Sequence, residues 1–430
     1  MWSHMPACVA TPSMSPAPTV PKRETVARKP VTMDSEDRAV ERRSGALTGC
    51  KVLLGICGGI AAVDSVRLLR ELRRHGADAT VIMSYSAQRV ISPLAVEWAA
   101  GVKPVTEWGA EMAQLEPHDA VLVSPATRRC LAAHVHGVLD TPLQMALSAA
   151  RGRRDPIMFV PSMHSDLFDD PVTDDLCQAL VAEGASVIWG EREEGRYKTP
   201  DAVQIVADLC HLVNSRRPER RRVAVTLGRN RSRVDAVRWI TNSSSGRTGW
   251  AIAEHLYRMG HSVHAVAGEV TSQPAFELPF VTSADDADDM LGALLDLASS
   301  DDAPTAWVHA AAVLDYVVAE PATEKVASGA EQWGLGLVRS TKHLDALTPL
   351  CGDCCRIAFK LESGVSDAQL IESARSLLQK HELDGVVANH LEEVSGHTGR
   401  RGLWVSDDAE PMPISNLGEL AELIDAAICG

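Results

Sequence analysis

Three polar segments in the second half of the chain carry residue types suited to nucleotide chemistry. The first contains Asn242, Ser244, Ser245 and Gly246 and leads into a helix expected over residues 247–259. Serine and glycine before a helix can present backbone N–H groups and the positive end of the helix dipole to a phosphate. Serines before helices are also ordinary N-caps. The run alone leaves phosphate binding and helix capping open.

The second segment is Ala310–Tyr316, followed by Lys325. A strand that ends in small residues such as Ala311 lets a flat base approach the backbone. The carboxylate of Asp315 can bind ribose hydroxyls or base amines, and the following lysine can neutralise a triphosphate. Taken by itself, an aspartate such as Asp315 is more often a turn or cap residue than a ligand-binding one.

The third segment, Asp384–His390, is an expected strand that ends near Asn389. Its amide could face a ligand, or it could hydrogen-bond its own backbone as many loop asparagines do. In open α/β sheets, ligands bind at the carboxyl ends of the strands. We therefore expect all three segments to converge on one crevice.

Two series of alternating strands and helices must position these segments. The pattern of apolar runs predicts strands at 52–56, 79–83, 120–123, 157–160 and 187–189, and then at 223–226, 263–266, 306–309, 357–360, 385–388 and 403–405. Helices are expected around Val66–Leu72, which Gly76 ends, and at 247–259, 285–299, 366–380 and 416–428. This alternation predicts an α/β protein with two doubly wound domains, each a parallel sheet covered by helices on both faces.

The domain boundaries follow from composition. Residues 1–48 are rich in Pro, Ser, Thr, Arg and Lys and show no apolar periodicity, which predicts a disordered tail. The polar, proline-containing stretch 214–221 predicts a linker. It separates a first domain over 49–213 from a second over 222–430.

The overall composition excludes several classes of protein. A net charge of -15 over 430 residues argues against wrapping nucleic acid over a broad surface. No apolar run reaches membrane-spanning length, and the start has no signal-peptide core. Of ten cysteines only Cys351, Cys354 and Cys355 cluster, without further ligands at zinc spacing, so we expect no metal site. Reduced thiols are typical of a cytoplasmic protein, here one that acts on small molecules.

Together the three segments resemble the ligase domain of the bifunctional phosphopantothenoylcysteine decarboxylase/phosphopantothenate–cysteine ligase family, over roughly residues 222–405. Several motifs match in order. The matches are Asn242–Gly249 (Asn-x-Ser-Ser-Gly, basic, x, Gly), Ala311–Tyr316 (Ala-Ala-Val-x-Asp-Tyr), Lys325 (a lysine of the family's lysine-rich segment), Phe359 with Glu362 (a strand end), and Val387–Asn389 (Val-Ala-Asn).

The resemblance implies a CTP- and Mg²⁺-dependent reaction. A carboxylate would attack the α-phosphorus of CTP to give an acyl-cytidylate and pyrophosphate, and the amine of cysteine would then displace CMP. By analogy Asn242 contacts the acyl intermediate and Arg238 the substrate phosphate, and Lys325 stabilises the developing charge. The residues that the resemblance assigns to the nucleotide are Ser244, Ser245, Gly246, Ala311, Asp315, Phe359 and Asn389. The family also implies coenzyme A biosynthesis and a homo-oligomer.

The chain departs from the family pattern at three places. Arg229 replaces a glycine after the first strand of the second domain, where the backbone approaches a ligand closely. Ser328 stands for a second lysine, and Ser340-Thr341 for an Asn-Pro pair. These changes leave the acyl donor and the amine open. A ligase half that keeps its motifs beside a decarboxylase half that has lost several suggests a specialised paralogue that makes an amide in a secondary pathway.

The first domain resembles the flavin-dependent decarboxylase half of the same family over roughly residues 50–212. Gly59 falls in the first phosphate loop, Ser84 in the second, and Ser124 and Thr127 at the Ala-Pro-Ala-Thr strand end. The flavodoxin-like fold and FMN binding are what this resemblance implies. FMN is therefore an expected cofactor of the first half.

Three positions that the decarboxylase needs are changed. Glu111 stands where the family has histidine, His164 stands for asparagine, and the flap at 191–197 has no cysteine. Without a thiol in the flap, the intermediate of thiol oxidation has no evident proton donor. His118 lies near the missing histidine but is interpreted as a surface residue. The alternatives to a ligase are an FMN-dependent decarboxylase or oxidoreductase of a cysteinyl substrate, and a non-catalytic regulatory paralogue.

Overall fold

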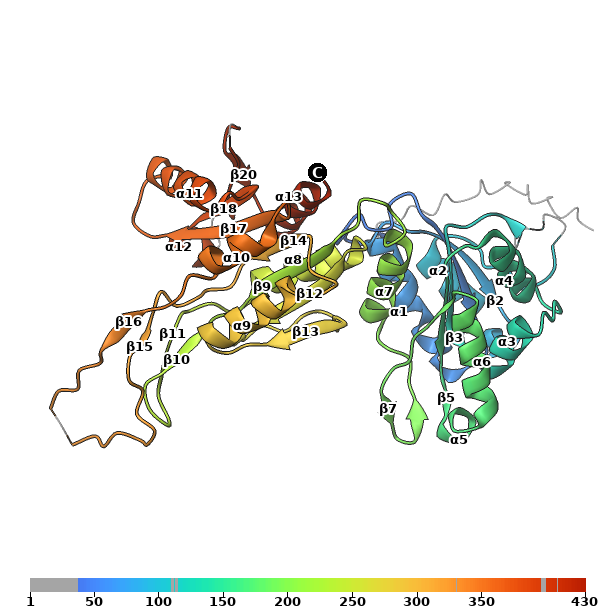
Figure 1. The fold of residues 1–430 in the computed structure, drawn as a ribbon. Coiled ribbons are helices and arrows are strands. Elements are labelled where there is room, and N and C mark those ends of the chain that lie inside the picture. The colour runs from blue at the N-terminus through green and yellow to red at the C-terminus, as the bar shows by residue number, and fades with distance from the viewer. Residues whose placement is uncertain (1–37, 110–111, 113–114, 330, 396–399, 408) are drawn as a thin grey trace, which may run out of the picture. The chain divides into compact units, whose positions relative to one another are not determined.

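The computed structural model describes residues 38–430, except 110–111, 113–114, 330, 396–399 and 408. Each predicted domain is a twisted sheet flanked by helices (Figure 1). Most of the predicted tail, residues 1–37, lies outside the described part of the chain. Among the described residues, no helix is long and apolar enough to cross a membrane.

The first domain is a five-stranded parallel sheet in the order β2-β1-β3-β4-β6. Its strands are β1 (Lys51–Ile56), β2 (Asp78–Met83), β3 (Ala120–Ala126), β4 (Ile157–Pro161) and β6 (Ser186–Val187). Its helices are α1 (Ser65–Arg74), α2 (Pro93–Ala100), α3 (Arg128–Val135), α4 (Pro142–Arg153), α5 (Ser165–Phe168), α6 (Pro171–Ala182) and α7 (Ala202–Asn214), with 3₁₀ turns η2 (Ile60–Asp64) and η3 (Ala87–Arg89). The strand order is that of flavodoxin-like sheets, which confirms the predicted fold class.

Alternate residues of the strands enter two different cores. Val52, Leu54 and Ile56 of β1 pack with α1, α2 and α7, whereas Leu53 packs with α3, α4 and α6 on the other face. Burial on both faces explains why these strands read as continuous apolar runs. At 25 cal/mol per Å² of buried apolar surface, such sheets are stabilised mainly by this packing.

The ordered part of the first domain begins before the boundary expected at residue 49. Ala46 and Leu47 are buried in the core beside α1, with 2% and 0% of their surface exposed. The Leu47 amide donates to the carbonyl of His75 at 2.9 Å. Two apolar residues are too short a run to show periodicity, so the sequence pattern missed this anchor.

The last predicted strand of this domain, at 187–189, is shorter than expected. Strand β6 ends at Val187, and the Trp189 ring instead packs edge-on against Phe168 with 4.9 Å between centroids. A small separate sheet follows, in the order β5-β8-β7, formed by β5 (Met163–His164), β7 (Arg192–Glu193) and β8 (Arg196–Tyr197).

The second domain has an eight-stranded sheet in the order β13-β12-β9-β14-β17-β18-β19-β20. Its strands are β9 (Arg222–Leu227), β12 (Ser262–Ala267), β13 (Phe280–Ser283), β14 (Ala306–His309), β17 (Cys355–Glu362), β18 (Gly385–His390), β19 (Gly402–Val405) and β20 (Met412–Ile414). Its helices are α8 (Arg247–Arg258), α9 (Ala287–Ala298), α10 (His343–Cys351), α11 (Asp367–His381), α12 (Leu391–Ser395) and α13 (Leu417–Cys429). Helices α8 and α13 cover one face, and α9, α10 and α11 cover the other.

The last two strands of this sheet differ from the all-parallel prediction. Strands β19 and β20 are antiparallel to their neighbours. The connection from β18 contains only the short α12, and a parallel return needs a longer crossover. Two hairpin-like pairs lie outside the sheet and were not predicted: β10 (Arg231–Arg233) with β11 (Trp239–Thr241), and β15 (Tyr316–Val318) with β16 (Leu337–Arg339).

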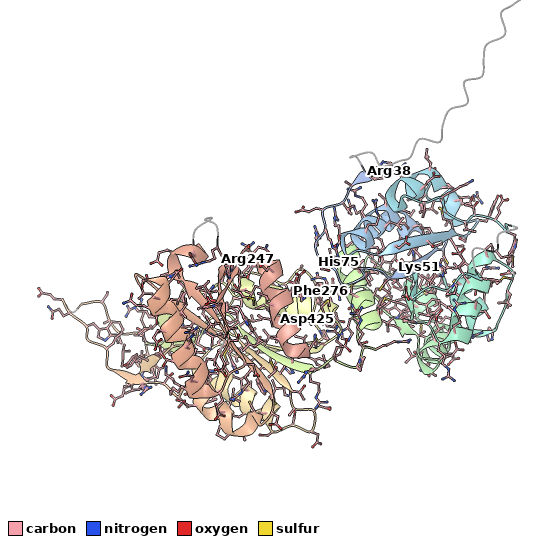
Figure 2. The ribbon with its side chains drawn as sticks, turned by 90° about the horizontal axis from the view of Figure 1, so that it is seen from above. Arg38, Lys51, His75, Arg247, Phe276 and Asp425 are labelled. Atoms are coloured by element: carbon pink, nitrogen blue, oxygen red, sulfur yellow. The ribbon has the colours of Figure 1, made fainter. Side chains whose placement is uncertain are left out.

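A buried acid in α1 links the anchor segment to the first domain's core. Glu71 is 2% exposed and lies 2.8 Å from Arg74 Nη1, 3.0 Å from Arg43 Nη1 and 3.3 Å from His75 Nε2, the last labelled in Figure 2. Burial alone would raise the pKa of Glu71, but hydrogen bonds from His75 and Arg74 and the charge of Arg43 outweigh it and lower the pKa to about 2.

Glu71→Gln is expected to lower the free energy of unfolding at pH 7 by roughly 3 kcal/mol, the value of this pKa depression. The stabilisation is full above pH 4.5, the usual pKa of the group, and is lost as the pH falls toward 2. Urea unfolding of both proteins at pH 7 and pH 3 checks this, with the exposed Glu422→Gln as the matched control. An equal difference between the proteins at both pH values would contradict it.

Candidate functional site

The carboxyl ends of three neighbouring strands in the second domain are tied together by backbone hydrogen bonds. After β9, the Gly228 carbonyl accepts from the Ala312 amide at 2.8 Å, and the Asn230 amide donates to the Ala312 carbonyl at 3.2 Å. The Arg229 amide donates to the Glu269 carbonyl at 3.1 Å, and the Glu269 amide returns a bond of 2.8 Å. The ends of β9, β12 and β14 thus form one rigid edge.

Asn242 lies at this edge, as the convergence argument predicted. Its Nδ2 donates to the carbonyls of Ala312 at 3.0 Å and Val313 at 3.4 Å. The adjacent Ala311 amide donates to Thr226 Oγ1 at 3.2 Å. The structure therefore brings the first and second polar segments together through an asparagine side chain.

The loop before α8 is held by its carbonyl groups. The Ser245 carbonyl accepts from Ser272 Oγ at 2.8 Å and from the amides of Thr271 and Ser272 at 3.2 and 3.1 Å. The amides of Gly246 and Arg247 make only 3.4 Å contacts, to the hydroxyls of Ser244 and Ser245. Hydrogen bonds of that length are weak. These two N–H groups at the helix N-terminus are thus available to an anion.

Arg229, the departure from the family's glycine, also holds this loop. Its Nη1 donates to the Ser244 carbonyl at 3.3 Å, and its Nη2 lies 3.2 Å from Glu269 Oε1. The hydrogen bond from Arg229 lowers the pKa of Glu269 below its usual value. The Arg229 side chain therefore lies against the protein's own loop at Ser244. Sequence reasoning missed Glu269, because nothing in its spacing marks it as a partner.

Two further predicted residues of this site, Asp315 and Lys325, are exposed. Asp315 is 72% exposed, and its Oδ1 lies 3.5 Å from the ammonium of Lys342, a residue that the sequence did not single out. Lys325 is exposed on the connection between β15 and β16. Among the described contacts, no hydrogen bond joins Lys325 to the loop at 244–246.

The segment that carries Lys325 is instead held to Arg238. Arg238 Nη2 donates to the Val326 carbonyl at 3.4 Å, and the buried Asp235 accepts from the Val326 amide at 3.1 Å. Arg238 Nη1 also lies 3.0 Å from Asp235 Oδ2, and its guanidinium stacks over Trp333 at 5.0 Å. Arg238 and Lys325 thus share one region, but Arg238 already has a carboxylate partner.

The third segment lies on β17 and β18. Phe359 is partly buried in the core beside Val387, its register partner. Asn389 is 4% exposed, and its Nδ2 donates to the carbonyl of Arg401 at 2.7 Å. The bond crosses to the start of β19, so the interpretation that Asn389 binds its own local backbone is wrong. Its Oδ1 is buried and has no hydrogen-bond partner among the described residues.

The first domain gathers its four predicted residues at the carboxyl edge of β1, β2 and β3. Ser84 follows β2, and its amide donates to the Ile56 carbonyl at 2.9 Å. A Cβ on Gly58 would lie 2.2 Å from Ser86 Cβ, so only glycine allows the two loops to approach this closely. Strand β3 contains the buried Ser124 and is followed by Thr127, the N-cap of α3, while Gly59 is the N-cap of η2.

The flap of the first domain forms although it is short. Strand β8 pairs with β5, which sets Arg196 opposite His164 and Tyr197 opposite Met163. The Tyr197 ring stacks on Phe168 with 3.8 Å between centroids. Because the flap holds no cysteine, these described contacts supply aromatic packing but no thiol. Glu111 lies outside the described residues.

His118 is not the surface residue that we expected. It is 6% exposed, and burial lowers its pKa. It lies two residues before the fully buried strand β3, which begins at Ala120. A single histidine between polar neighbours gives no periodic signal that could show this.

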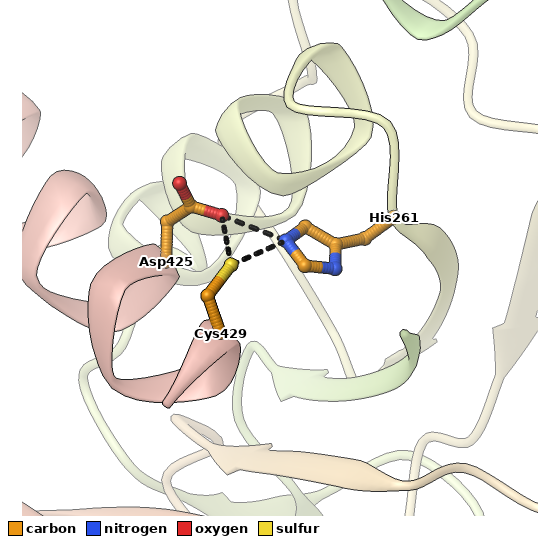
Figure 3. A group of neighbouring side chains, drawn as sticks. All are labelled: His261, Asp425 and Cys429. Atoms are coloured by element: carbon orange, nitrogen blue, oxygen red, sulfur yellow. Dashed lines mark hydrogen bonds and ion pairs between the residues drawn. The ribbon is translucent and has the colours of Figure 1, made fainter. Parts of the chain in front are cut away.

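One cluster of metal-ligating residue types occurs among the described residues (Figure 3). His261, Asp425 and Cys429 hold their ligand atoms within 4.8 Å of one another. Arg220 Nη1 lies 3.0, 3.2 and 3.3 Å from the same three side chains, and the Arg221 amide donates to His261 Nδ1 at 3.1 Å. His261 Nε2 therefore carries the proton toward Asp425. The guanidinium of Arg220 already supplies a positive charge to this cluster. The cluster joins α13 to the residues that precede β9 and β12, and we assign no metal to it.

The three clustered cysteines do not converge on one point. Cys354 Sγ donates to the Pro304 carbonyl at 3.3 Å, and Cys355 Sγ donates to the Ala427 carbonyl at 3.6 Å. Burial raises the pKa of Cys351 to about 11 and that of Cys355 to about 12. Thiols with raised pKa values are poor nucleophiles and metal ligands.

Comparisons with known proteins cover both domains. Residues 219–426 match the family model described as DNA/pantothenate metabolism flavoprotein C-terminal domain, and residues 40–214 match the model described as flavoprotein. The chain is 34% identical over 387 residues to the coenzyme A biosynthesis bifunctional protein CoaBC of Thermococcus kodakarensis, covering 88% of this chain and 95% of that protein. It is 27% identical over 356 residues to the CoaBC protein of Methanocaldococcus jannaschii, covering 81% and 85%.

Two solved structures each align with about half of the chain. The crystal structure of the DNA/pantothenate metabolism flavoprotein from Streptococcus pneumoniae aligns with a TM-score of 0.44 and 23% identity, over 48% of this chain and 98% of that one. The C-terminal domain of a CoaBC bifunctional protein aligns with a TM-score of 0.39 and 24% identity, over 50% of this chain and 96% of that one.

Proposed function

Because the chain belongs to the CoaBC family of bifunctional coenzyme A biosynthesis proteins, we propose that its second domain is a CTP-dependent ligase. It would join phosphopantothenate, or an analogue, to cysteine or another amine. The observation that carries this proposal is the pair of hydrogen bonds from Asn242 to the Ala312 and Val313 carbonyls. They join the anion-binding loop to the small-residue turn proposed for the base.

The proposed chemistry uses the two N–H groups before α8 and the carbonyl-lined turn. A carboxylate oxygen attacks the α-phosphorus, the bond to the bridging oxygen breaks, and pyrophosphate leaves. The amine nitrogen then attacks the acyl carbon, loses a proton, and displaces CMP. The N–H groups of Gly246 and Arg247 would hold phosphate oxygens, and Asn242 would orient the acyl group. Lys325 would reach the phosphates from the β15–β16 connection.

Mg²⁺ would enter with the nucleotide and neutralise its phosphate oxygens, as it does in most nucleotide-dependent reactions. Asp315 fits the base or ribose better than a metal, since its carboxylate lies beside Lys342. We therefore assign no protein ligand to the ion.

An isotope experiment tests the acyl-cytidylate directly. The carboxylate of 4′-phosphopantothenate is labelled with ¹⁸O and incubated with the protein, CTP, Mg²⁺ and cysteine. Attack on the α-phosphorus transfers one label to CMP, which mass spectrometry detects. Label in inorganic phosphate, together with CDP, would mean attack on the γ-phosphorus and would overturn the proposed intermediate.

We further propose that the first domain binds FMN without decarboxylating a cysteinyl substrate. The residues that would form a cradle for the group are Gly59, Ser84, Ser124 and Thr127. Gly58 and Ser86 hold the two loops of this cradle together, because a Cβ at residue 58 would clash with Ser86. FMN, when bound, supplies two-electron oxidation of a thiol. The flap presents Arg196 and Tyr197 at its paired strand and no thiol, which supports loss of the decarboxylation step.

Gly58→Ala is expected to abolish FMN retention. The new methyl group would lie 2.2 Å from Ser86 Cβ and 2.9 Å from the Ser86 carbonyl carbon, so the two loops must separate, at a cost of about 1–3 kcal/mol. Visible flavin absorbance of the purified protein measures retention. Gly152→Ala is the control, because nothing lies within 4 Å of its new methyl group. A yellow Gly58→Ala protein would contradict the proposed cradle, and a colourless native protein would contradict FMN binding itself.

The homo-oligomer and the pathway stay predictions. Rescue of a strain that lacks phosphopantothenate–cysteine ligase would place the protein in coenzyme A synthesis and count against a specialised role. Failure to rescue by expressed, folded protein would favour another acyl donor or amine.

A further inference from the structure

Arg401 stands immediately before β19, fixed by hydrogen bonds on both sides. Its amide donates to the Ile414 carbonyl at 2.6 Å, and its carbonyl accepts from Asn389 Nδ2 at 2.7 Å. From this anchored backbone the side chain reaches α8, where Nη2 donates to Thr248 Oγ1 in the first helical turn. Arg401 thus connects the end of β18 to the helix whose N-terminus follows Gly246.

The charge of Arg401 has no acidic partner in the described part of the chain. Its side chain is half-buried, and its Nε is buried without a hydrogen-bond acceptor among the described residues. Burial and then the charge of Arg247, which is labelled in Figure 2, lower the pKa of Arg401. The positive charge of Arg247 and the positive end of the α8 helix dipole both lie near the Arg401 side chain. Such a group is costly unless an anion compensates it.

The adjacent Arg400, in contrast, has two acidic partners. Its Nη2 lies 2.9 Å from Asp367 Oδ1 and 3.0 Å from Glu393 Oε1, and its Nη1 lies 2.9 Å from Asp367 Oδ2. Both carboxylates are on neighbouring helices of the second domain. Arg400 is therefore compensated by the protein, whereas Arg401 is presented uncompensated toward the helix N-terminus.

We propose that Arg401 is a further phosphate-binding residue of the nucleotide site, engaging the β- and γ-phosphates that leave as pyrophosphate. This inference rests on the proposed ligase function and adds a residue to its site. Arg401 would also supply the positive charge that is missing where Ser328 replaces the family's second lysine. Asn389 is then a positioning residue, because it holds the Arg401 backbone.

Binding of CTP and of inorganic pyrophosphate to the full chain, measured by calorimetry with Mg²⁺, tests the assignment. Arg401→Gln is expected to weaken both about tenfold to hundredfold, as for loss of charge-assisted hydrogen bonds, and Arg401→Lys should recover part of the affinity. Arg400→Gln, the matched control, should leave both affinities unchanged. Without ligand, Arg401→Gln should unfold at an unchanged or higher temperature, whereas a purely structural arginine would give a lower one.

The outcomes separate this inference from the proposed function. Arg401-dependent pyrophosphate binding in a protein that shows no ligation would support the phosphate site and contradict the ligase. Ligation by the native protein together with full nucleotide affinity in Arg401→Gln would overturn the inference alone. A raised KM for cysteine with unchanged CTP affinity would also overturn it, since Arg401 would then bind the acceptor's carboxylate.

Discussion

Asn242→Asp is expected to slow CTP-dependent pyrophosphate release by about a hundredfold, the size of effect that follows when reacting groups are misplaced by about an ångström. The Asn242 amide donates to the carbonyls of Ala312 at 3.0 Å and Val313 at 3.4 Å. A carboxylate can make neither bond, and its charge would repel both the carbonyls and the phosphates. The loop and the base turn would lose their connection.

The control for this variant is the same substitution at a helix cap. The Asn416 side chain accepts from the Glu419 amide at 3.0 Å, and aspartate caps helices equally well. Asn416→Asp should therefore keep the native rate. A rate in Asn242→Asp within a few-fold of the native protein would show that this amide does not organise the site.

Gly246→Ala is expected to lower the stability of the second domain by about 2–4 kcal/mol and to remove nucleotide binding. Gly246 has a φ of 82°, and a Cβ there would lie 2.5 Å from Val270 Cγ1. The loop must shift away from the segment that follows β12. Because the N–H groups of Gly246 and Arg247 lie in the displaced stretch, the proposed phosphate site would move with it.

Urea unfolding and calorimetric titration with CTP measure the two effects separately. Gly292→Ala in α9 is the control, because nothing lies within 4 Å of its new methyl group and alanine favours a helix by up to about 1 kcal/mol. Native stability and native CTP affinity in Gly246→Ala would contradict the assignment of this loop.

The predicted architecture depended on patterns that repeat, and these were confirmed. Runs such as Val52–Ile56 and Val223–Thr226 are buried on both faces of parallel sheets, and the first domain has the expected flavodoxin-like order. Elements too short for a pattern were missed, among them the core anchor Ala46–Leu47. The antiparallel β19 and β20 were missed for a different reason, since strand direction follows from the length of a connection.

The candidate site was predictable where chain order and strand ends determine it. The contact of Asn242 with the turn after β14 followed from the rule that carboxyl ends of parallel strands meet. Partners that come from distant loops were not predictable, because a residue such as Glu269 acquires its role only from what lies opposite it. The role proposed for Arg401 was not predictable for the same reason. Only the structure shows that its side chain has no acidic partner among the described residues.

Nucleotide-dependent pyrophosphate release tests the central claim most directly. Purified protein is given Mg²⁺, 4′-phosphopantothenate and cysteine, with CTP in one reaction and ATP in the other. We predict release with CTP that exceeds release with ATP and that is lost in both Lys325→Gln and Asn242→Asp. No release with either nucleotide, from protein shown to be folded, would contradict the assignment of the second domain as a phosphopantothenate–cysteine ligase.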